Sequence, residues 1–332
     1  MFLSEQLARK PVVVLDGAMG TELFRHGVDL SLPLWSANAL IRAPHLVRNI
    51  HFWNLHAGAD VLTANTFRTN LRALRAAGVE ARWEEFNLKA LEFAFEARER
   101  YRAARPVTLA ASLAPVEDCY RPDLAPSDEE LAEEHGRQAE LLALLGAELL
   151  LAETMNSARE AGAAARACAA TGREFAVSFV CTADGRLLSG EDLAAAVTAV
   201  LAHGPVALLV NCVSAASMLG PLTLLRAATV LPVGCYANAG TPVGGGPCTR
   251  QDLTDDAHVE EAGRWVSMGA RIVGGCCGIS PALLARIAGR IAPMAAEFIA
   301  QGIHRHAPLP PELAAVLAAQ LPATEIEGEH AA

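Results

Sequence analysis

Eight short apolar segments alternate along this chain with eight longer segments of helical periodicity, and this alternation limits the folds that the chain can adopt. The apolar segments span residues 11–15, 60–64, 106–111, 148–152, 174–179, 205–210, 231–235 and 270–273. The helical segments span residues 44–57, 83–102, 128–145, 157–170, 191–201, 214–227, 255–268 and 281–291. Apolar strands joined by helices predict a parallel sheet that is covered on both faces. Eight such units favour a single closed (β/α)8 TIM barrel, of the α/β class, over an open doubly wound sheet.

The repeated units account for residues 1–292, which we expect to form the barrel. Residues 293–332 form a short C-terminal extension, with one helix predicted at 311–321 and an acidic tail at 325–330. We expect this extension to serve packing or assembly, for instance in a homo-oligomer, rather than the site. The glycine-rich segment 239–247 lacks the lysine and the serine or threonine of a phosphate-binding loop, so it is either a lid or an ordinary surface loop.

Composition excludes several classes of partner. The chain has 332 residues, and its 27 basic and 37 acidic side chains give a net charge of −10, which argues against binding to nucleic acid or to an anionic membrane. The first ten residues lack a signal-peptide pattern. The longest apolar stretch, 141–152, is interrupted by Gly146 and Glu148 and is too short to cross a bilayer. We therefore expect a soluble cytoplasmic protein, in which cysteines serve the core, a metal or catalysis rather than disulfides.

Polar side chains cluster where the apolar segments end. In a barrel of this kind the catalytic residues lie at the carboxyl ends of the strands. The residues at those ends are Asp16, Asn65, Ser112, Glu153, Ser178 or Cys181, Asn211 with Cys212, Tyr236 with Asn238, and Cys276 with Cys277. Two carboxylates, several amides and three cysteines predict a functional site at this end of the barrel.

Three of the cysteines have the positions of a metal site. Cys212 follows the sixth apolar segment, and the adjacent Cys276 and Cys277 follow the eighth, among three glycines that allow close backbone approach. Strands two places apart in a sheet are separated by roughly 10 Å, so inward-facing thiolates can share one ion. Three thiolates leave one tetrahedral position of a zinc ion open, which is typical of a catalytic site. A redox role of the vicinal pair is the alternative interpretation. The remaining cysteines are predicted to be small buried core residues: Cys119, Cys168, Cys181, Cys235 and Cys248.

Two carboxylates also stand out. Glu153 ends a wholly apolar segment, where a carboxylate must be paired or must face a cavity. Asp16 stands in a D-G pair that by itself indicates a turn. Together they predict a binding site for an ammonium group, unless one of them only caps a helix or forms a turn.

Five motifs in this order resemble the homocysteine S-methyltransferase family, which includes the betaine-dependent and S-methylmethionine-dependent enzymes and the homocysteine domain of cobalamin-dependent methionine synthase. They are Asp16-Gly17-Ala18-Met19-Gly20-Thr21, Thr63-Ala64-Asn65-Thr66-Phe67, Glu153-Thr154, Asn211-Cys212 and Gly274-Gly275-Cys276-Cys277-Gly278. The resemblance covers about residues 11–292 and implies a (β/α)8 barrel. It implies zinc ligands at Cys212, Cys276 and Cys277. It implies that homocysteine is bound by Asp16, Gly17, Asn65, Thr66, Glu153 and Asn211, with Asp16 and Glu153 on its amino group.

The resemblance also implies a pocket for the methyl donor, formed by Trp35, Phe67, Arg68, Tyr236 and Asn238. Arg68 occupies the position of a tyrosine in the betaine enzyme, and a guanidinium there would repel the onium group that aromatic faces attract, unless it points to solvent. We expect a sulfonium donor such as S-methylmethionine. Betaine and a separate corrinoid or folate partner are the alternatives, and a selenol acceptor stays open.

Overall fold

The computed structural model describes residues 1–102, 105–240 and 251–300, with side chains described up to residue 294. The predicted helix at 311–321, the acidic tail, Cys248 and most of the glycine-rich segment lie outside the described residues. Within the described ranges, no helix is long and apolar enough to cross a membrane.

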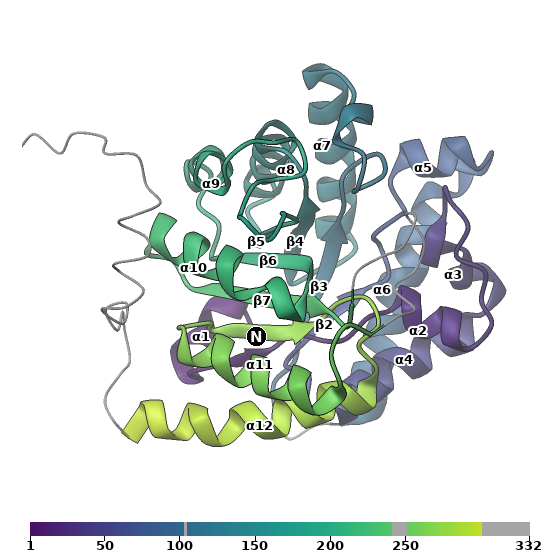
Figure 1. Ribbon diagram of the computed structural model, residues 1–332. Coiled ribbons are helices and arrows are strands. Elements are labelled where there is room, and N and C mark those ends of the chain that lie inside the picture. The colour runs from purple at the N-terminus through teal and green to yellow at the C-terminus, as the bar shows by residue number, and fades with distance from the viewer. Residues whose placement is uncertain (103–104, 241–250, 301–332) are drawn as a thin grey trace, which may run out of the picture.

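Eight parallel strands form one sheet that closes on itself, which confirms the predicted TIM barrel (Figure 1). The strands are β1 (Val13–Val14), β2 (Val61–Ala64), β3 (Thr108–Leu113), β4 (Leu149–Met155), β5 (Glu174–Phe179), β6 (Ala207–Ser214), β7 (Val233–Asn238) and β8 (Ile272–Gly275). Their order in the sheet is β1-β8-β7-β6-β5-β4-β3-β2. A parallel bridge between Leu15 and Val61 joins the two ends of this order, and the Asp60 amide donates to the Val14 carbonyl at 2.7 Å.

Helices surround the strands, and each of the eight predicted helical segments has a counterpart (Figure 1). The α-helices are α1 (Leu3–Arg9), α2 (Gly20–Arg25), α3 (Ala39–Arg42), α4 (Pro44–His56), α5 (Leu71–Ala76), α6 (Trp83–Tyr101), α7 (Asp128–Leu144), α8 (Ala158–Ala170), α9 (Leu193–Leu201), α10 (Leu219–Ala228), α11 (Asp255–Ser267) and α12 (Pro281–Ala300). Four 3₁₀ turns accompany them: η1 (Trp35–Asn38), η2 (Glu80–Arg82), η3 (Pro122–Leu124) and η4 (Ala215–Ser217).

Two predicted helix boundaries are wrong. The segment expected to begin at residue 214 begins at Leu219, because β6 continues to Ser214 and a 3₁₀ turn follows it. The last helix does not end at 291 but continues to Ala300, with Pro293 inside it. The predicted domain division after residue 292 therefore falls within α12.

The strands extend further than their apolar segments. β4 ends at Met155 instead of 152, β6 at Ser214 instead of 210, and β7 at Asn238 instead of 235. Backbone pairing with the neighbouring strands continues past the apolar residues, since Asn211 pairs with Tyr236 and Ser214 with Asn238. The polar residues expected just after these strands are thus their last residues, where the sheet holds them in place.

One end of the barrel is closed by apolar packing. Leu3 and Leu7 of α1 pack with inward-facing strand residues such as Val13, Leu149 and Leu209. At the same end, Gln6 donates to the Asp60 carbonyl at 3.0 Å. Because the amino-terminal end of the barrel is filled in this way, an open cavity has room only at the carboxyl ends of the strands.

Candidate metal centre and substrate cavity

A cavity lies at the carboxyl end of the barrel, where the sequence predicted a site. The predicted residues that line it are Asp16, Gly17, Trp35, Asn65, Phe67, Arg68, Glu153, Cys212, Tyr236, Cys276 and Cys277. The other three predicted residues, Thr66, Asn211 and Asn238, are buried beside the lining rather than within it. Because Ser112 of β3 also lines the cavity, the barrel brings together residues from seven different strand ends around one space.

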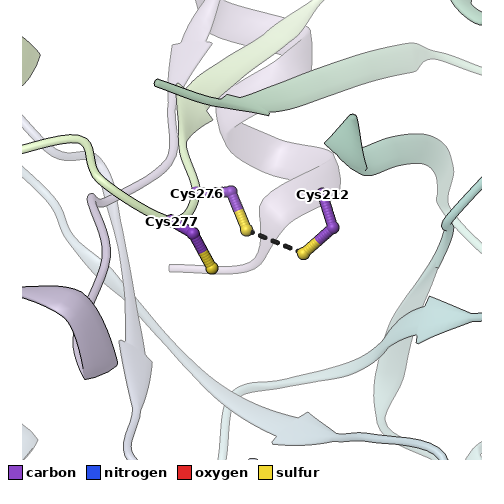
Figure 2. Close-up of side chains that lie close together, drawn as sticks. All are labelled: Cys212, Cys276 and Cys277. Carbon is purple, nitrogen blue, oxygen red and sulfur yellow. Dashed lines mark hydrogen bonds between the residues drawn. The ribbon is translucent and has the colours of Figure 1, made fainter. Parts of the chain in front are cut away.

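Three of these lining residues are the cysteines predicted to hold a metal. The sulfur atoms of Cys212, Cys276 and Cys277 all lie within 4.8 Å of one another, and those of Cys212 and Cys276 are 3.1 Å apart. Figure 2 shows the Cys212 side chain facing Cys276 across the site, with Cys277 beside it. None of the three forms a disulfide within the described part of the chain. The pKa of Cys212 is raised well above its ordinary value, first by its hydrogen bonds with Cys276 and Cys277 and then by burial. Three thiolates this close together need a cation to be stable at neutral pH, so the donor set fits a thiophilic divalent metal.

A distortion in β6 aims Cys212 into the cavity. The pairing register between β6 and β7 shifts between Asn211 and Ser214, and Cys212 has a φ of 56°, in the left-handed region that β-carbon-bearing residues rarely adopt. The Asn211 amide holds this region: its Nδ2 donates to Thr154 Oγ1 at 2.8 Å, and its Oδ1 accepts from Ser178 Oγ at 2.7 Å. Asn211 is predicted to bind substrate; in the structure its side-chain amide bonds to Thr154 of β4 and Ser178 of β5.

Asn238 joins the two strands that carry the thiols. Its Nδ2 donates to the Cys212 carbonyl at 3.0 Å, and its Oδ1 accepts from the Cys277 amide at 3.1 Å. The sequence placed Asn238 in the donor pocket. In the structure, Asn238 is buried beside the cavity lining, where its amide joins the backbones of β6 and β8.

The glycines before the thiols are required by close packing. A β-carbon on Gly274 would lie 2.7 Å from the Leu15 side chain, and one on Gly275 would lie 2.5 Å from Ile279. Contacts below 3.0 Å cannot be accommodated without backbone movement, so no larger residue fits there. This packing holds the start of the Cys276-Cys277 turn against β1.

The two predicted carboxylates face the cavity from different strands. Asp16 accepts hydrogen bonds from the Thr63 amide at 2.7 Å and the Thr63 hydroxyl at 2.9 Å. Glu153 accepts from Ser112 Oγ and, at 2.9 Å, from the Tyr236 hydroxyl. Burial is the main cause that raises the pKa of Asp16 to about 8 and that of Glu153 to about 7. Neither group has a positively charged side chain within 4.0 Å among the described residues, so both are available to a cationic ligand.

The same cavity is also lined by Trp35, Phe67 and Arg68 and by residues that the sequence did not single out. Asn65 holds the Trp35 turn in place, since its Oδ1 accepts from Ser36 Oγ at 2.6 Å. The possibility that Arg68 points to solvent is wrong, because the residue is only 6% exposed.

The residues that sequence reasoning missed are Asp118, Cys119 and Tyr120, in the loop after β3. Cys119 was predicted to be a core residue, but it is only partly buried and lines the cavity. The core prediction is confirmed for Cys168, Cys181 and Cys235. The one signal that this loop offered was its position at the carboxyl end of a strand.

Fold and site together define a TIM-barrel protein with a three-cysteine centre and a paired-carboxylate cavity. A sequence profile of the family described as homocysteine S-methyltransferase matches residues 13–291. The chain belongs to this family of methyltransferase enzymes.

Individual relatives agree with this assignment. The chain is 32% identical to a homocysteine S-methyltransferase of Escherichia coli over 86% of its own length and 96% of the relative. It is 29% identical to a selenocysteine methyltransferase of Astragalus bisulcatus, over 81% of this chain and 89% of that one. Among solved structures, it resembles the metallated form of the homocysteine methyltransferase MmuM from Escherichia coli, with a TM-score of 0.76, 29% identity, and coverage of 86% of this chain and 98% of that chain.

The buried carboxyl of Asp16 predicts an unusual pH dependence of stability. Its pKa of about 8 in the folded protein lies above the value of 3.8 expected when it is exposed, so the folded state holds a proton that the unfolded state has lost. The free energy of unfolding should therefore fall as pH rises from about 5 to about 8. Asp16→Asn cannot ionise at this position. The variant should therefore lose less stability than the wild-type protein over this pH range, and it should be more stable than the wild type at pH 8. Urea denaturation of both proteins at several pH values measures this; parallel pH profiles would contradict it.

Proposed function

We propose that the chain transfers a methyl group from a small donor to the sulfur of L-homocysteine, which gives methionine. The observation that carries this proposal is the convergence of three thiols and two buried carboxylates on one cavity. A thiol-rich centre suits a sulfur nucleophile, and paired carboxylates suit the ammonium group of an amino acid. Membership of the homocysteine S-methyltransferase family supports the same reaction.

We infer that the metal is zinc and that Cys212, Cys276 and Cys277 hold it. Three cysteine ligands fit zinc and leave one position for a substrate. When bound, zinc would lower the pKa of the acceptor thiol, which otherwise lies near 8.5, so that the reactive thiolate is available at neutral pH. The metallated form of the Escherichia coli relative supports a metal at this centre.

Asp16 and Glu153 would hold the ammonium group of homocysteine. Their hydrogen bonds to Thr63, Ser112 and Tyr236 keep both carboxylates oriented before substrate arrives. An ammonium group between them favours their ionised forms and offsets the cost of burying two like charges. The amino acid is thereby held with its sulfur toward the three cysteines, which orients it for reaction.

The transfer itself exchanges one sulfur–carbon bond for another. The homocysteine sulfur attacks the donor methyl group in line, and a new S–CH₃ bond forms as the donor's own bond to that methyl breaks. The bonding electron pair stays on the donor. With a sulfonium donor, the donor sulfur becomes a neutral thioether, and the proton of the acceptor thiol passes to solvent. With S-methylmethionine as donor, both products are methionine.

Selenocysteine is a second candidate acceptor, because the chain also resembles the selenocysteine methyltransferase of Astragalus bisulcatus. Selenocysteine has the same ammonium and carboxylate groups as homocysteine and a selenol that ionises more readily. Its side chain is one methylene shorter than that of homocysteine. A comparison of the two acceptors therefore tests which side-chain length suits the separation between the two carboxylates and the proposed metal centre.

Replacement of one proposed ligand tests the metal assignment. Cys276→Ala should lose the bound zinc and reduce methyl transfer at least a hundredfold, because the acceptor thiol then remains protonated. Cys168→Ala removes a buried cysteine of α8 that does not line the cavity and should keep both zinc and activity. Metal analysis and methionine formation are measured on the same preparations. Full activity in a zinc-free Cys276→Ala protein would contradict the proposal and would favour the redox role of the vicinal pair.

A donor screen tests the second substrate. With L-homocysteine as acceptor, we expect methionine to form from S-methylmethionine and not from betaine, with S-adenosylmethionine as a second sulfonium donor. Betaine as the best donor would overturn the choice of a sulfonium. A purified, zinc-loaded chain that is inert with all three donors would instead favour a corrinoid or folate partner as the methyl source. Repeating the screen with selenocysteine measures the acceptor preference.

A further inference from the structure

We propose that Arg68 binds the carboxylate of the methyl donor and so favours donors that carry a carboxylate. The inference rests on the proposed function and adds to it the group by which the donor is recognised. It starts from a buried cation with few partners: Arg68 is 6% exposed and lines the cavity, and its guanidinium donates one hydrogen bond, from Nη1 to the Glu117 carbonyl at 2.6 Å.

The neighbouring Arg72, unlike Arg68, is paired with carboxylates. Its Nε donates to the Glu117 carboxylate, and its Nη1 lies 3.2 Å from the Glu130 carboxylate. Within the described part of the chain, no carboxylate lies within 4.0 Å of the Arg68 guanidinium. The carboxylate of Glu117, the nearest candidate in the sequence, is thus engaged by Arg72, while only the Glu117 main chain contacts Arg68.

A buried guanidinium that no carboxylate contacts is costly, since it stays charged at every physiological pH. Five N–H groups form a planar fork that matches a carboxylate with two parallel bonds. Because one N–H is used and the side chain lines the cavity, the structure offers the rest of the fork to a ligand. A planar anion, in particular a carboxylate, is the group that this site fits.

The loop that carries Arg68 is held in place before any ligand binds. Thr66 Oγ1 donates to the Ser112 carbonyl at 2.8 Å, and Thr69 Oγ1 donates to Asn87 Oδ1 at 2.6 Å. Asn87 in turn donates to the Thr69 carbonyl at 3.1 Å. These buried bonds join the turn after β2 to β3 and α6, so the ordering of this loop costs no binding energy when a substrate arrives.

The donor, rather than homocysteine, is the source of this carboxylate. The ammonium group of homocysteine is assigned to Asp16 and Glu153, and in an α-amino acid the carboxylate is attached to the same carbon as the ammonium group. Burial lowers the pKa of Arg68, and the charges that act against this effect are those of Cys119, Asp118 and Glu117, all on the loop after β3. Arg68 lines the cavity together with Trp35 and Phe67, whose aromatic faces suit a sulfonium. The carboxylate of the donor would offset the repulsion between the guanidinium and the sulfonium.

Two donors that differ only in the carboxylate test the assignment. S-methyl-L-methionine carries it, and (3-aminopropyl)dimethylsulfonium is the same molecule without it. In the zinc-loaded protein, Arg68→Gln should lower kcat/KM for S-methylmethionine by roughly 10- to 100-fold, the effect of one lost hydrogen bond between charged groups. It should leave kcat/KM for the carboxylate-free donor and KM for homocysteine nearly unchanged. Arg68→Lys should restore part of the loss, because lysine keeps the charge but not the fork.

Arg72→Gln is the matched control, because it removes an arginine that contacts the same glutamate but does not line the cavity. It should leave the preference between the two donors unchanged. An equal loss with both donors in Arg68→Gln would overturn the proposal, because it would assign Arg68 a structural role. A rise in KM for homocysteine alone would assign Arg68 to the acceptor. A wild-type protein that is inert with both donors would overturn the proposed sulfonium donor itself, and the carboxylate assignment with it.

Discussion

The closure of the parallel sheet is the constraint on which the rest of this site depends. Cys212 and Cys276 are far apart in sequence, and they meet because β6 and β8 both pair with β7 in the closed ring. Asn238, at the end of β7, bonds to the backbone of both ligand strands. Nothing local to either cysteine would bring their sulfurs to 3.1 Å. The three-cysteine cluster is therefore a property of the whole barrel, and a disturbance of strand pairing at β7 would separate the three sulfur atoms.

The cavity is lined by buried ionisable side chains that no oppositely charged side chain contacts among the described residues. Asp16 and Glu153 are buried carboxyls whose pKa values are raised chiefly by burial, and Arg68 is a buried guanidinium with one hydrogen bond. Burial of unpaired ionisable groups costs stability, and such groups persist where they serve function. Under the proposed function, each of these side chains gains an oppositely charged partner when a zwitterionic substrate binds. The same reasoning explains the left-handed backbone at Cys212, which is unfavourable but directs the thiol inward.

The sequence alone predicted the barrel and predicted that the three cysteines and the two carboxylates lie together at its carboxyl end. It could do so because the strand ends of such a fold share one face. Cys276 and Glu153 could be placed from the segments that precede them. The hydrogen bonds that Asn211 and Asn238 form with neighbouring strands could not be predicted, because the sequence does not show which groups an amide at a strand end will contact. The burial of Arg68 depends on the path of the loop after β3. Contacts between residues far apart in sequence determine that path, so it could not be predicted from local sequence patterns. For the same reason Cys119 was mistaken for a core residue.

The central claim is that the three cysteines leave one metal position open for the sulfur of homocysteine. X-ray absorption at the zinc edge counts the sulfur ligands directly, in the zinc-loaded protein with and without L-homocysteine. The proposed site predicts three sulfur ligands and one lighter ligand in the absence of homocysteine, and four sulfur ligands in its presence. An unchanged count of sulfur ligands on addition of saturating homocysteine would contradict the account.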